Sequence, residues 1–381
     1  MLIANDIFII DNNNFKQQKT QTYGYKWLGN EGFFINVTNE NNTVRISRSC
    51  LAPYIAYYDD NSIYCISNSI NSLVLYLETQ GKTLTKSDKL LSPTTVCYDT
   101  QIEEIKLIPI DKDIYIDDTG LHLEKNNRYF SKPFNPDVIE DWFNSYKLLF
   151  NQIAEHSTVD LSAGQDSRIL YSMVDKTKIN LVHSSTKKQF APEYYITNLI
   201  AATDEIKLNT SRMNLSSTNL SSADTNRFSN YSDMDIFQFR RTLLLDYINY
   251  STTYYYVMGT GTESYKSCRF MNDLKIPELW GVKYHSKNLI SYYDYNVMFI
   301  YPFTDSRLMS MKSTETEHIL DFIYKNFIDE KYLNIPFYNS SYQGQYYYKY
   351  TDYVFLPSKD KIIERLNPRP DYYIEDITIF K

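Results

Sequence analysis

The sequence has few of the residues that mark metal sites and disulfide-bonded domains. Its 381 residues include only four cysteines and five histidines. Cys50, Cys65, Cys97 and Cys268 form no CxxC pair, and no two histidines are spaced as HxxxH. A structural zinc site is therefore not expected, and the cysteines are predicted to be free thiols in a reducing compartment.

Long apolar runs and a basic amino-terminal segment are also missing. No window approaches the roughly 18 uninterrupted apolar residues of a membrane helix, and "MLIANDIFIIDNNN" has no basic region before its short apolar run. Lys and Arg number 39 against 46 Asp and Glu, a formal net charge of −7. This balance argues against a nucleic-acid or anionic-membrane binder, although a local basic pocket stays open. We expect a cytoplasmic protein with no membrane span and no nucleic-acid partner.

The bulk composition is that of a folded protein. Apolar residues make up 43% and charged residues 22% of the chain, which is typical of globular proteins. The length predicts two or three domains. The 37 tyrosines have two interpretations, a surface that stacks on sugars or the residue bias of an AT-rich genome, in which Tyr fills half-buried positions.

Residues 1–130 have the pattern of a β-rich domain. Short segments rich in β-branched and aromatic residues alternate with Asn, Asp or Gly turns, which predicts mostly antiparallel strands. These segments are "GFFINVT", "TVRISRS", "SIYCISNS", "IEEIKLIPI" and "DIYIDDTGLHLEK". "NSLVLYLET" has the spacing of a short helix.

The pattern changes after "YFSKPFNPD" at 129–137, whose two prolines predict a linker. Residues 138–157 have apolar residues at helical spacing, with Asp and Glu near the start, where they suit the helix dipole. A strand at 158–161, a helix from about 166, a strand at 179–185 and a helix near 191 follow. This alternation predicts a parallel sheet with crossover helices. The chain is predicted to be helical from there to about residue 335, and the tail is left unassigned.

A turn of small residues stands out in "TVDLSAGQDSRIL", residues 158–170, because the chain has only ten glycines. A small-residue loop that leads into a helix presents backbone N–H groups to an anion. Ser162 and Ser167 add hydroxyl donors, and Ala163 and Gly164 allow close approach of a phosphate. The Asp166 carboxylate repels a phosphate unless a divalent cation lies between them, which favours a metal-bound polyphosphate. The alternative is a plain strand-to-helix turn with Asp166 in the first turn; the Walker A spacing is absent.

"LSAGQDSR", residues 161–168, resembles the SGGxDS pyrophosphate loop of the N-type ATP pyrophosphatases, in particular of the asparagine synthetase family. Ala163 stands where the family has the first glycine of its pair, and alanine fits there only if its φ is negative.

Three further stretches resemble the same family in the same order. Residues 182–202 are similar to the strand that lines the adenine and the helix after it, with Glu193 at the acidic position. "YYYVMGTGTESY" at 254–265 is similar to the family's strand and G-x-G-x-D-E turn, with Gly259, Gly261 and Glu263 in the matching places. "IYPFTDSRLMSM" at 300–311 is similar to its R-x-P-F-x-D-x-x-L stretch. The resemblance covers most of residues 20–315.

The resemblance implies two domains. Residues 1–130 would be a degenerate α+β domain with the β-sheets of the class II glutamine amidotransferases. Residues 131–381 would be an α/β domain with a parallel sheet and a PP-loop, like the adenine nucleotide alpha-hydrolases.

The resemblance also implies ATP and Mg²⁺ as ligands. The implied metal ligands are Asp166 and Glu263. The implied nucleotide-binding residues are Leu161, Ser162, Ala163, Gly164, Gln165, Asp166, Ser167, His183, Ser184, Gly259 and Gly261. From the residues themselves, Arg168 is either a phosphate contact or a helix-surface arginine, and Asp305 and Arg307 are expected to brace the domain.

The family's glutaminase needs a cysteine as residue 2, whose freed α-amino group assists the thiol. Residue 2 is Leu here, so we expect the first domain not to hydrolyse glutamine. Related lactam synthetases and lasso-peptide cyclases have also lost this activity and use an amine already on the substrate.

The implied activity is an ATP-dependent carbon–nitrogen ligase that releases pyrophosphate and AMP. Ser264 replaces the Glu that assists asparagine synthesis in the family, which argues against asparagine as the product. Lys349, Lys359 and Lys361 are candidates for the family's catalytic lysine, and each is otherwise a solvated surface lysine. A retired, non-catalytic accessory protein is the alternative. Whether the chain forms a homodimer or binds a pathway partner stays open.

Overall fold

The structure is a computed structural model of the whole chain. It describes residues 7–50, 55–86, 100, 102–109, 111–126, 128–179, 181–185, 191–206, 208–211, 254–259, 261–262, 298–312, 318–333, 335, 337–339 and 345–347.

Contacts divide the chain into two compact units. The first contains Met1–Phe134, Leu215–Asp246 and Thr260–Glu315, and the second contains Asn135–Asn214, Tyr247–Gly259 and Thr316–Lys381. The first boundary falls within the predicted linker at 129–137. The units are not continuous in sequence, because residues 260–315 return to the first unit. The predicted division into domains 1–130 and 131–381 stays a prediction.

The first unit contains two antiparallel sheets. One has the strand order β1-β6-β5-β7 and the other the order β2-β3-β4-β8-β9. The bounds of the first sheet's strands are β1 Ile9–Asp11, β5 Ala56–Asp59, β6 Tyr64–Ser67 and β7 Lys106–Leu107. Those of the second are β2 Gln21–Leu28, β3 Glu31–Glu40, β4 Thr43–Arg48, β8 Lys112–Asp117 and β9 Gly120–Lys125. The unit also contains η1 Phe15–Gln17 and helix α1 Ile70–Thr79. The predicted antiparallel strands and the short helix are confirmed.

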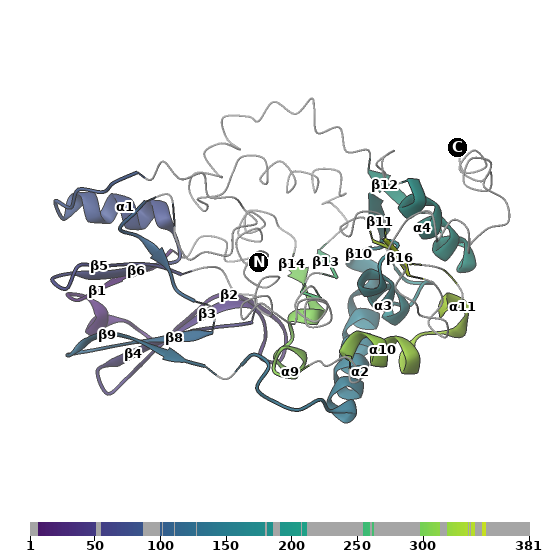
Figure 1. The fold of residues 1–381 in the computed structure, drawn as a ribbon, viewed down its shortest axis with the longest axis horizontal. Coiled ribbons are helices and arrows are strands. Elements are labelled where there is room, and N and C mark those ends of the chain that lie inside the picture. The colour runs from purple at the N-terminus through teal and green to yellow at the C-terminus, as the bar shows by residue number, and fades with distance from the viewer. Residues whose placement is uncertain are drawn as a thin grey trace. The chain divides into compact units, whose positions relative to one another are not determined.

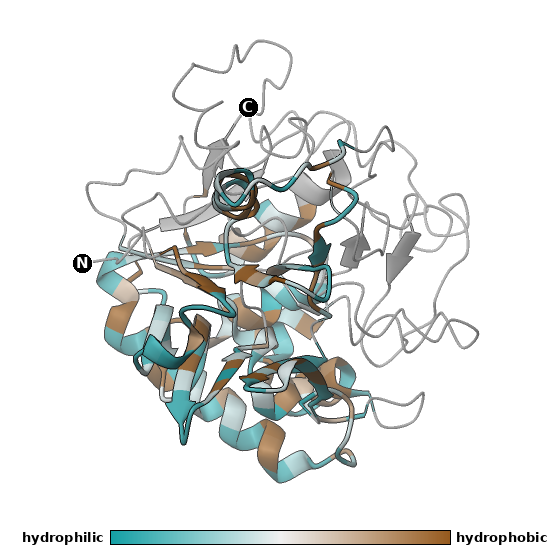
Figure 2. Cartoon of the chain, turned by 90° about the vertical axis from the view of Figure 1, so that its left-hand side faces the viewer, coloured by the Kyte–Doolittle hydropathy of each residue, from teal (hydrophilic) through white to brown (hydrophobic). Residues whose placement is uncertain are grey.

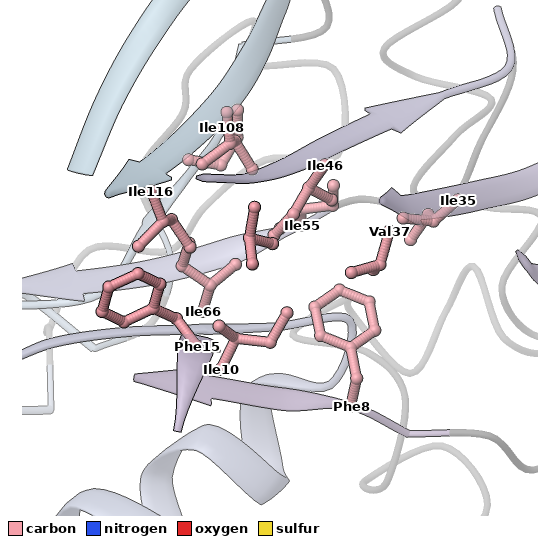
Figure 3. Close-up of a cluster of buried hydrophobic side chains, with 12 residues drawn as sticks. Phe8, Ile10, Phe15, Ile35, Val37, Ile46, Ile55, Ile66, Ile108 and Ile116 are labelled. Atoms are coloured by element: carbon pink, nitrogen blue, oxygen red, sulfur yellow. The ribbon is translucent and has the colours of Figure 1, made fainter. Parts of the chain in front are cut away.

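A core of aliphatic and aromatic side chains lies between the two sheets (Figure 3). It includes Ile10 and Ile66 from one sheet and Val37, Ile46 and Ile116 from the other, all with 0% or 1% exposure. Side chains alternate between the faces of a strand, so Cys65 and Ala56 point to the other face, where they meet Leu73 and Leu77 of α1. The unit is therefore layered as helix, sheet and sheet (Figure 1).

The second unit contains a parallel sheet. Its strands lie in the order β12-β11-β10-β13, with bounds β10 Ser157–Asp160, β11 Leu181–Ser185, β12 Asn209–Ser211 and β13 Tyr255–Val257. The pairings β10–β11, β10–β13 and β11–β12 are all parallel. Helices α3 Gln165–Met173 and α4 Ala191–Thr203 follow β10 and β11, which confirms the predicted alternation.

Helix α2 Pro136–Ile153 begins where its sequence predicts. The Asn135 side chain accepts a hydrogen bond from the Asp137 N–H at 3.0 Å, and Pro136 occupies the first turn. The helix carries both hydrophobic and hydrophilic residues, as the other described helices do (Figure 2). Its Trp142 is fully buried, and Phe143 stacks on Phe327 with ring centroids 4.9 Å apart. Helix α2 thereby packs against α3 and α10 Ile319–Phe327.

The prediction that the chain is helical from 191 to 335 is wrong in part. β12, β13 and β14 Met298–Ile300 are strands of three residues each. They are too short to show a period of two, so their apolar residues resemble part of a helix. The remaining described elements are η2 Ala154–His156, η6 Pro302–Thr304, α9 Ser306–Met309, α11 Glu330–Leu333, β15 Phe337–Asn339 and β16 Gln345–Tyr347. None of the described helices is both long and apolar enough to cross a membrane.

Candidate functional site

Two of the predicted loops leave neighbouring strands at the same edge of the parallel sheet. Val159 of β10 pairs with Val182 of β11 on one side and with Val257 of β13 on the other. Since these strands are parallel, the loop after Asp160 and the turn after Val257 both begin at the carboxyl edge. The chain adds β11 and β12 on one side of β10 and β13 on the other, so the order reverses at β10. Ligands of open parallel sheets bind at such a reversal.

Two serine hydroxyls form hydrogen bonds inside the loop between β10 and α3. The hydroxyls of Ser162 and Ser167 lie 2.7 Å apart, and the Ser162 N–H donates to the Ser167 hydroxyl at 2.9 Å. The Gly164 N–H donates to the Ser162 hydroxyl at 3.1 Å. Leu161 is buried beneath the loop. The two serines therefore hold the shape of the loop, and the first turn of α3, where N–H groups lack helical acceptors, begins directly after it.

Ala163 fits into the loop at the place where the SGGxDS motif has a glycine. The backbone of Ala163 lies outside the positive-φ region, so the condition set by the sequence is met. Its side chain is fully buried. The methyl group therefore faces the interior of the unit, away from the solvent-facing side of the loop.

Both neighbouring glycines lie against Asp166. A Cβ added to Gly164 would lie 2.8 Å from Asp166 Oδ1, and one added to Gly259 would lie 3.3 Å from Asp166 Cβ and 3.3 Å from the Ser167 nitrogen. The turn after β13 thus packs its backbone onto the first turn of α3. The structure brings Gly259 of the third stretch against Asp166 and Ser167 of the first, and glycine is what allows the contact.

Gly261 and the fourth stretch contact each other within the first unit. Gly261 has φ +107°, and a Cβ there would lie 2.7 Å from Thr304 Cγ2. Asp305 is fully buried and accepts from Arg307 Nε at 3.0 Å and Nη2 at 2.8 Å. The Ser306 N–H donates to Glu31 Oε2 at 2.9 Å, and burial raises the pKa of Glu31. Asp305 and Arg307 therefore pair with each other, and the expectation that they brace the domain stays a prediction.

Several predicted residues lie outside what the structure describes. These are Glu263, Ser264, Lys349, Lys359 and Lys361. His183 and Ser184 belong to β11, and Glu193 belongs to α4, but their side chains are not described. Asp166 is the one predicted metal ligand within the described residues, and no group of three or more His, Cys, Asp or Glu is found among them.

Burial excludes one of the two interpretations that the sequence left open for Arg168. It is fully buried, so the helix-surface interpretation is incorrect. Its guanidinium donates to Tyr324 Oη at 3.0 Å and to the Ile335 carbonyl at 2.7 Å. Next to it, Gln165 Nε2 donates to Asp321 Oδ1 at 3.4 Å. No local signal in the sequence distinguishes this arginine from a solvated one, because its partners lie more than 150 residues further along the chain.

The two described cysteines are poor nucleophiles. Cys50 and Cys65 are buried free thiols. Burial raises the pKa of Cys50 well above its usual value and that of Cys65 to about 12. Both thiols therefore stay protonated at neutral pH.

A cluster of ionisable groups lies at the other end of α3, at the edge of the sheet away from the loop. Tyr171 donates to Asp204 at 2.8 Å, Lys331 donates to the same carboxylate at 2.6 Å, and the Tyr332 hydroxyl also bonds it. The Lys176 ammonium donates to the Tyr171 carbonyl and lies over the rings of Tyr171 and Tyr332. Burial lowers the pKa of Lys176 to about 8.

We expect Lys176→Met to stabilise the protein at pH 7, because it removes a partly buried cation. A lowering of its pKa from 10.5 to about 8 corresponds to at most about 3 kcal/mol. Between about pH 8 and 10.5 the unfolded chain still holds a proton that the folded chain has lost, so the wild type gains stability as pH rises. The advantage of the variant should shrink to about 1 kcal/mol at pH 9.5. Urea unfolding at both pH values measures this difference.

Lys178→Met is the matched control, because the Lys178 side chain is 55% exposed and pairs with Asp175 at 3.5 Å. It should change stability little at either pH. An advantage of Lys176→Met that does not vary with pH would contradict the lowered pKa of Lys176.

Comparisons with known proteins identify no family for this chain. No family model matches the sequence, and no curated protein does. Among solved structures, a glutamine phosphoribosylpyrophosphate amidotransferase from B. subtilis, complexed with ADP and GMP, aligns at 9% identity and a TM-score of 0.17. The alignment covers 65% of this chain and 46% of that chain. Similarity at this level supports no conclusion about family or function.

Proposed function

We propose that this protein is an ATP-dependent ligase that forms an amide bond by adenylating a carboxylate. The observation that carries the proposal is the close contact of Gly259 with Asp166, at the point where the strand order of the parallel sheet reverses. A glycine turn, a small-residue loop, a helix start and a carboxylate meet there. This set of groups suits a polyphosphate held through a divalent cation.

The proposed scaffold is that of the asparagine synthetase family. The two antiparallel sheets of the first unit are compatible with a degenerate amidotransferase-like domain, and the sheet order β12-β11-β10-β13 is compatible with a PP-loop domain. The support for the family comes from four sequence stretches in the same order. Residues of three of these stretches lie in contact: Gly259 contacts Asp166, and Gly261 contacts Thr304.

The proposed reaction has two steps. A carboxylate oxygen of the substrate attacks the α-phosphorus of ATP, and the bond to the pyrophosphate breaks. An amine then attacks the acyl carbon, and AMP leaves. The start of α3 and the loop before it would stabilise the charge that develops on the pyrophosphate. Asp166 would hold a Mg²⁺ ion, whose chemistry is to neutralise phosphate charge. The other predicted metal ligand, Glu263, lies outside the described residues.

The proposed amine does not come from glutamine hydrolysed at Cys50 or Cys65, since both thiols are buried with raised pKa values. An amine already on the substrate, free ammonia or a separate amine would serve the second step. The proposed carboxylate belongs to a peptide precursor or to a sugar acid.

Calorimetric titration of the full chain with ATP tests the proposal. We expect binding in the presence of Mg²⁺ that EDTA abolishes, and competition by magnesium pyrophosphate. The absence of binding by folded protein, with and without Mg²⁺, would overturn the ligase and favour a retired accessory protein of the same scaffold.

A further inference from the structure

A polar seam runs along one side of α3. Gln165, Arg168 and Tyr171 are spaced by three residues, so they lie on the same face of the helix. Gln165 bonds Asp321 of α10, Arg168 bonds Tyr324 of α10, and the ring of Tyr171 packs edge-on against Tyr332 of α11 at 6.0 Å. We call these contacts the α3 seam. They join α3 to residues 318–335 over the whole length of the helix.

Arg168 links this segment to the loop itself. Its Nη1 donates to the carbonyls of Ile335 at 2.7 Å and Tyr332 at 3.3 Å, and its Nη2 donates to the Ala163 carbonyl at 3.4 Å. Burial lowers the pKa of Arg168, but an arginine keeps its charge at neutral pH. One buried cation therefore binds oxygen atoms of the loop at one end and of residues 332–335 at the other.

Because Arg168 takes acceptors from both, the position of the loop and the position of residues 318–335 depend on each other. A buried guanidinium that loses its acceptors leaves a desolvated charge, which is strongly unfavourable. When residues 318–335 move away from α3, Arg168 loses the acceptors at Tyr324, Tyr332 and Ile335 and must turn toward water. The Ala163 carbonyl then loses its donor, and the loop loses a contact that fixes its shape.

We propose that Arg168 is a positioning residue that couples ligand binding at loop 161–167 to the docking of residues 318–335. The inference rests on the proposed function, because it takes that loop as the phosphate site. The coupling is reciprocal: a ligand that stabilises the loop stabilises the docked segment, and loosening the segment weakens the ligand. In the sequence this segment precedes the predicted lysines Lys349, Lys359 and Lys361.

Amide hydrogen exchange on the full chain, with magnesium pyrophosphate as the probe, tests the coupling. In the wild type we expect the probe to protect amides of residues 318–335 as well as those of the loop. Tyr324→Phe removes one acceptor of Arg168 and keeps the ring. It should weaken binding of magnesium pyrophosphate about 2- to 30-fold and reduce the protection of 318–335.

Two further variants separate positioning from simple stability. Tyr58→Phe removes a comparable hydroxyl, which bonds Asp60 at 2.8 Å in the other unit, and should leave binding unchanged. Arg168→Lys keeps the charge without the planar fork and should weaken binding more than Tyr324→Phe. Lower stability with unchanged affinity and unchanged protection in both seam variants would overturn the coupling alone. A wild type that does not bind the probe would overturn the proposed function as well.

Discussion

Asp166→Asn is expected to abolish the magnesium dependence of ATP binding. The carboxylate lies in the first turn of α3, packed between Gly164 and Gly259, where the N–H groups and the helix dipole favour an anion. Its negative charge opposes phosphate binding unless a cation intervenes. With Mg²⁺ present, we expect the variant to bind ATP about 100-fold more weakly than the wild type, a change of about 2.7 kcal/mol. Without Mg²⁺, it should bind at least as tightly, because the repulsion is gone.

A variant that binds ATP more weakly than the wild type with Mg²⁺, but at least as tightly without it, identifies a metal-bound phosphate site. Calorimetry of both proteins, with Mg²⁺ and with EDTA, measures it. Asp175→Asn is the control, since this carboxylate lies in the turn after α3 and accepts from the Thr177 N–H at 3.0 Å. It should leave both affinities unchanged. If Asp166→Asn and the wild type respond equally to Mg²⁺, Asp166 is not a metal ligand.

The features that could be predicted from the sequence are those with a local cause. The strands around Ile66 and Val37 are rich in β-branched and aromatic residues and are bounded by turn residues, so their signal is visible in the residues themselves. The crossover order around β10 follows from alternating strand and helix patterns, and a parallel sheet then places loop 161–164 and the turn at Gly259 at one edge.

The features that could not be predicted depend on partners far away in the sequence. Arg168 has the local context of a surface residue, and only the fold supplies oxygens from Tyr324 and Ile335. The return of residues 260–315 to the first unit depends on contacts such as that of Ser306 with Glu31 and of Phe299 with Tyr25. Such contacts produce no repeating pattern in the sequence, because each involves single residues and not one face of a helix or strand.

Gly24→Ala is expected to destabilise the first unit more than alanine at any other glycine with positive φ among the described residues. Gly24 lies in β2 opposite Phe34 of β3 and has φ +110°. A Cβ there would lie 2.1 Å from the Phe33 carbonyl oxygen and 2.9 Å from Phe34 Cα, both backbone atoms that cannot move aside. The left-handed backbone and the clash act together. We expect a loss of about 4 kcal/mol or more in the free energy of unfolding, measured by urea titration followed by circular dichroism.

Gly29→Ala is the matched control in the same hairpin. Gly29 also has a positive φ, +56°, but a Cβ there meets nothing within 4 Å. This variant keeps the backbone penalty and omits the clash, so it should cost about 1 kcal/mol. The hairpin also carries Tyr25, whose hydroxyl accepts from the Phe299 N–H at 3.3 Å, and Trp27, whose ring meets Tyr301 edge-on. Separating β2 from β3 therefore loosens the start of the stretch at 300–311. Equal losses of unfolding free energy in the two variants would mean that β2 and β3 do not approach closely at Gly24.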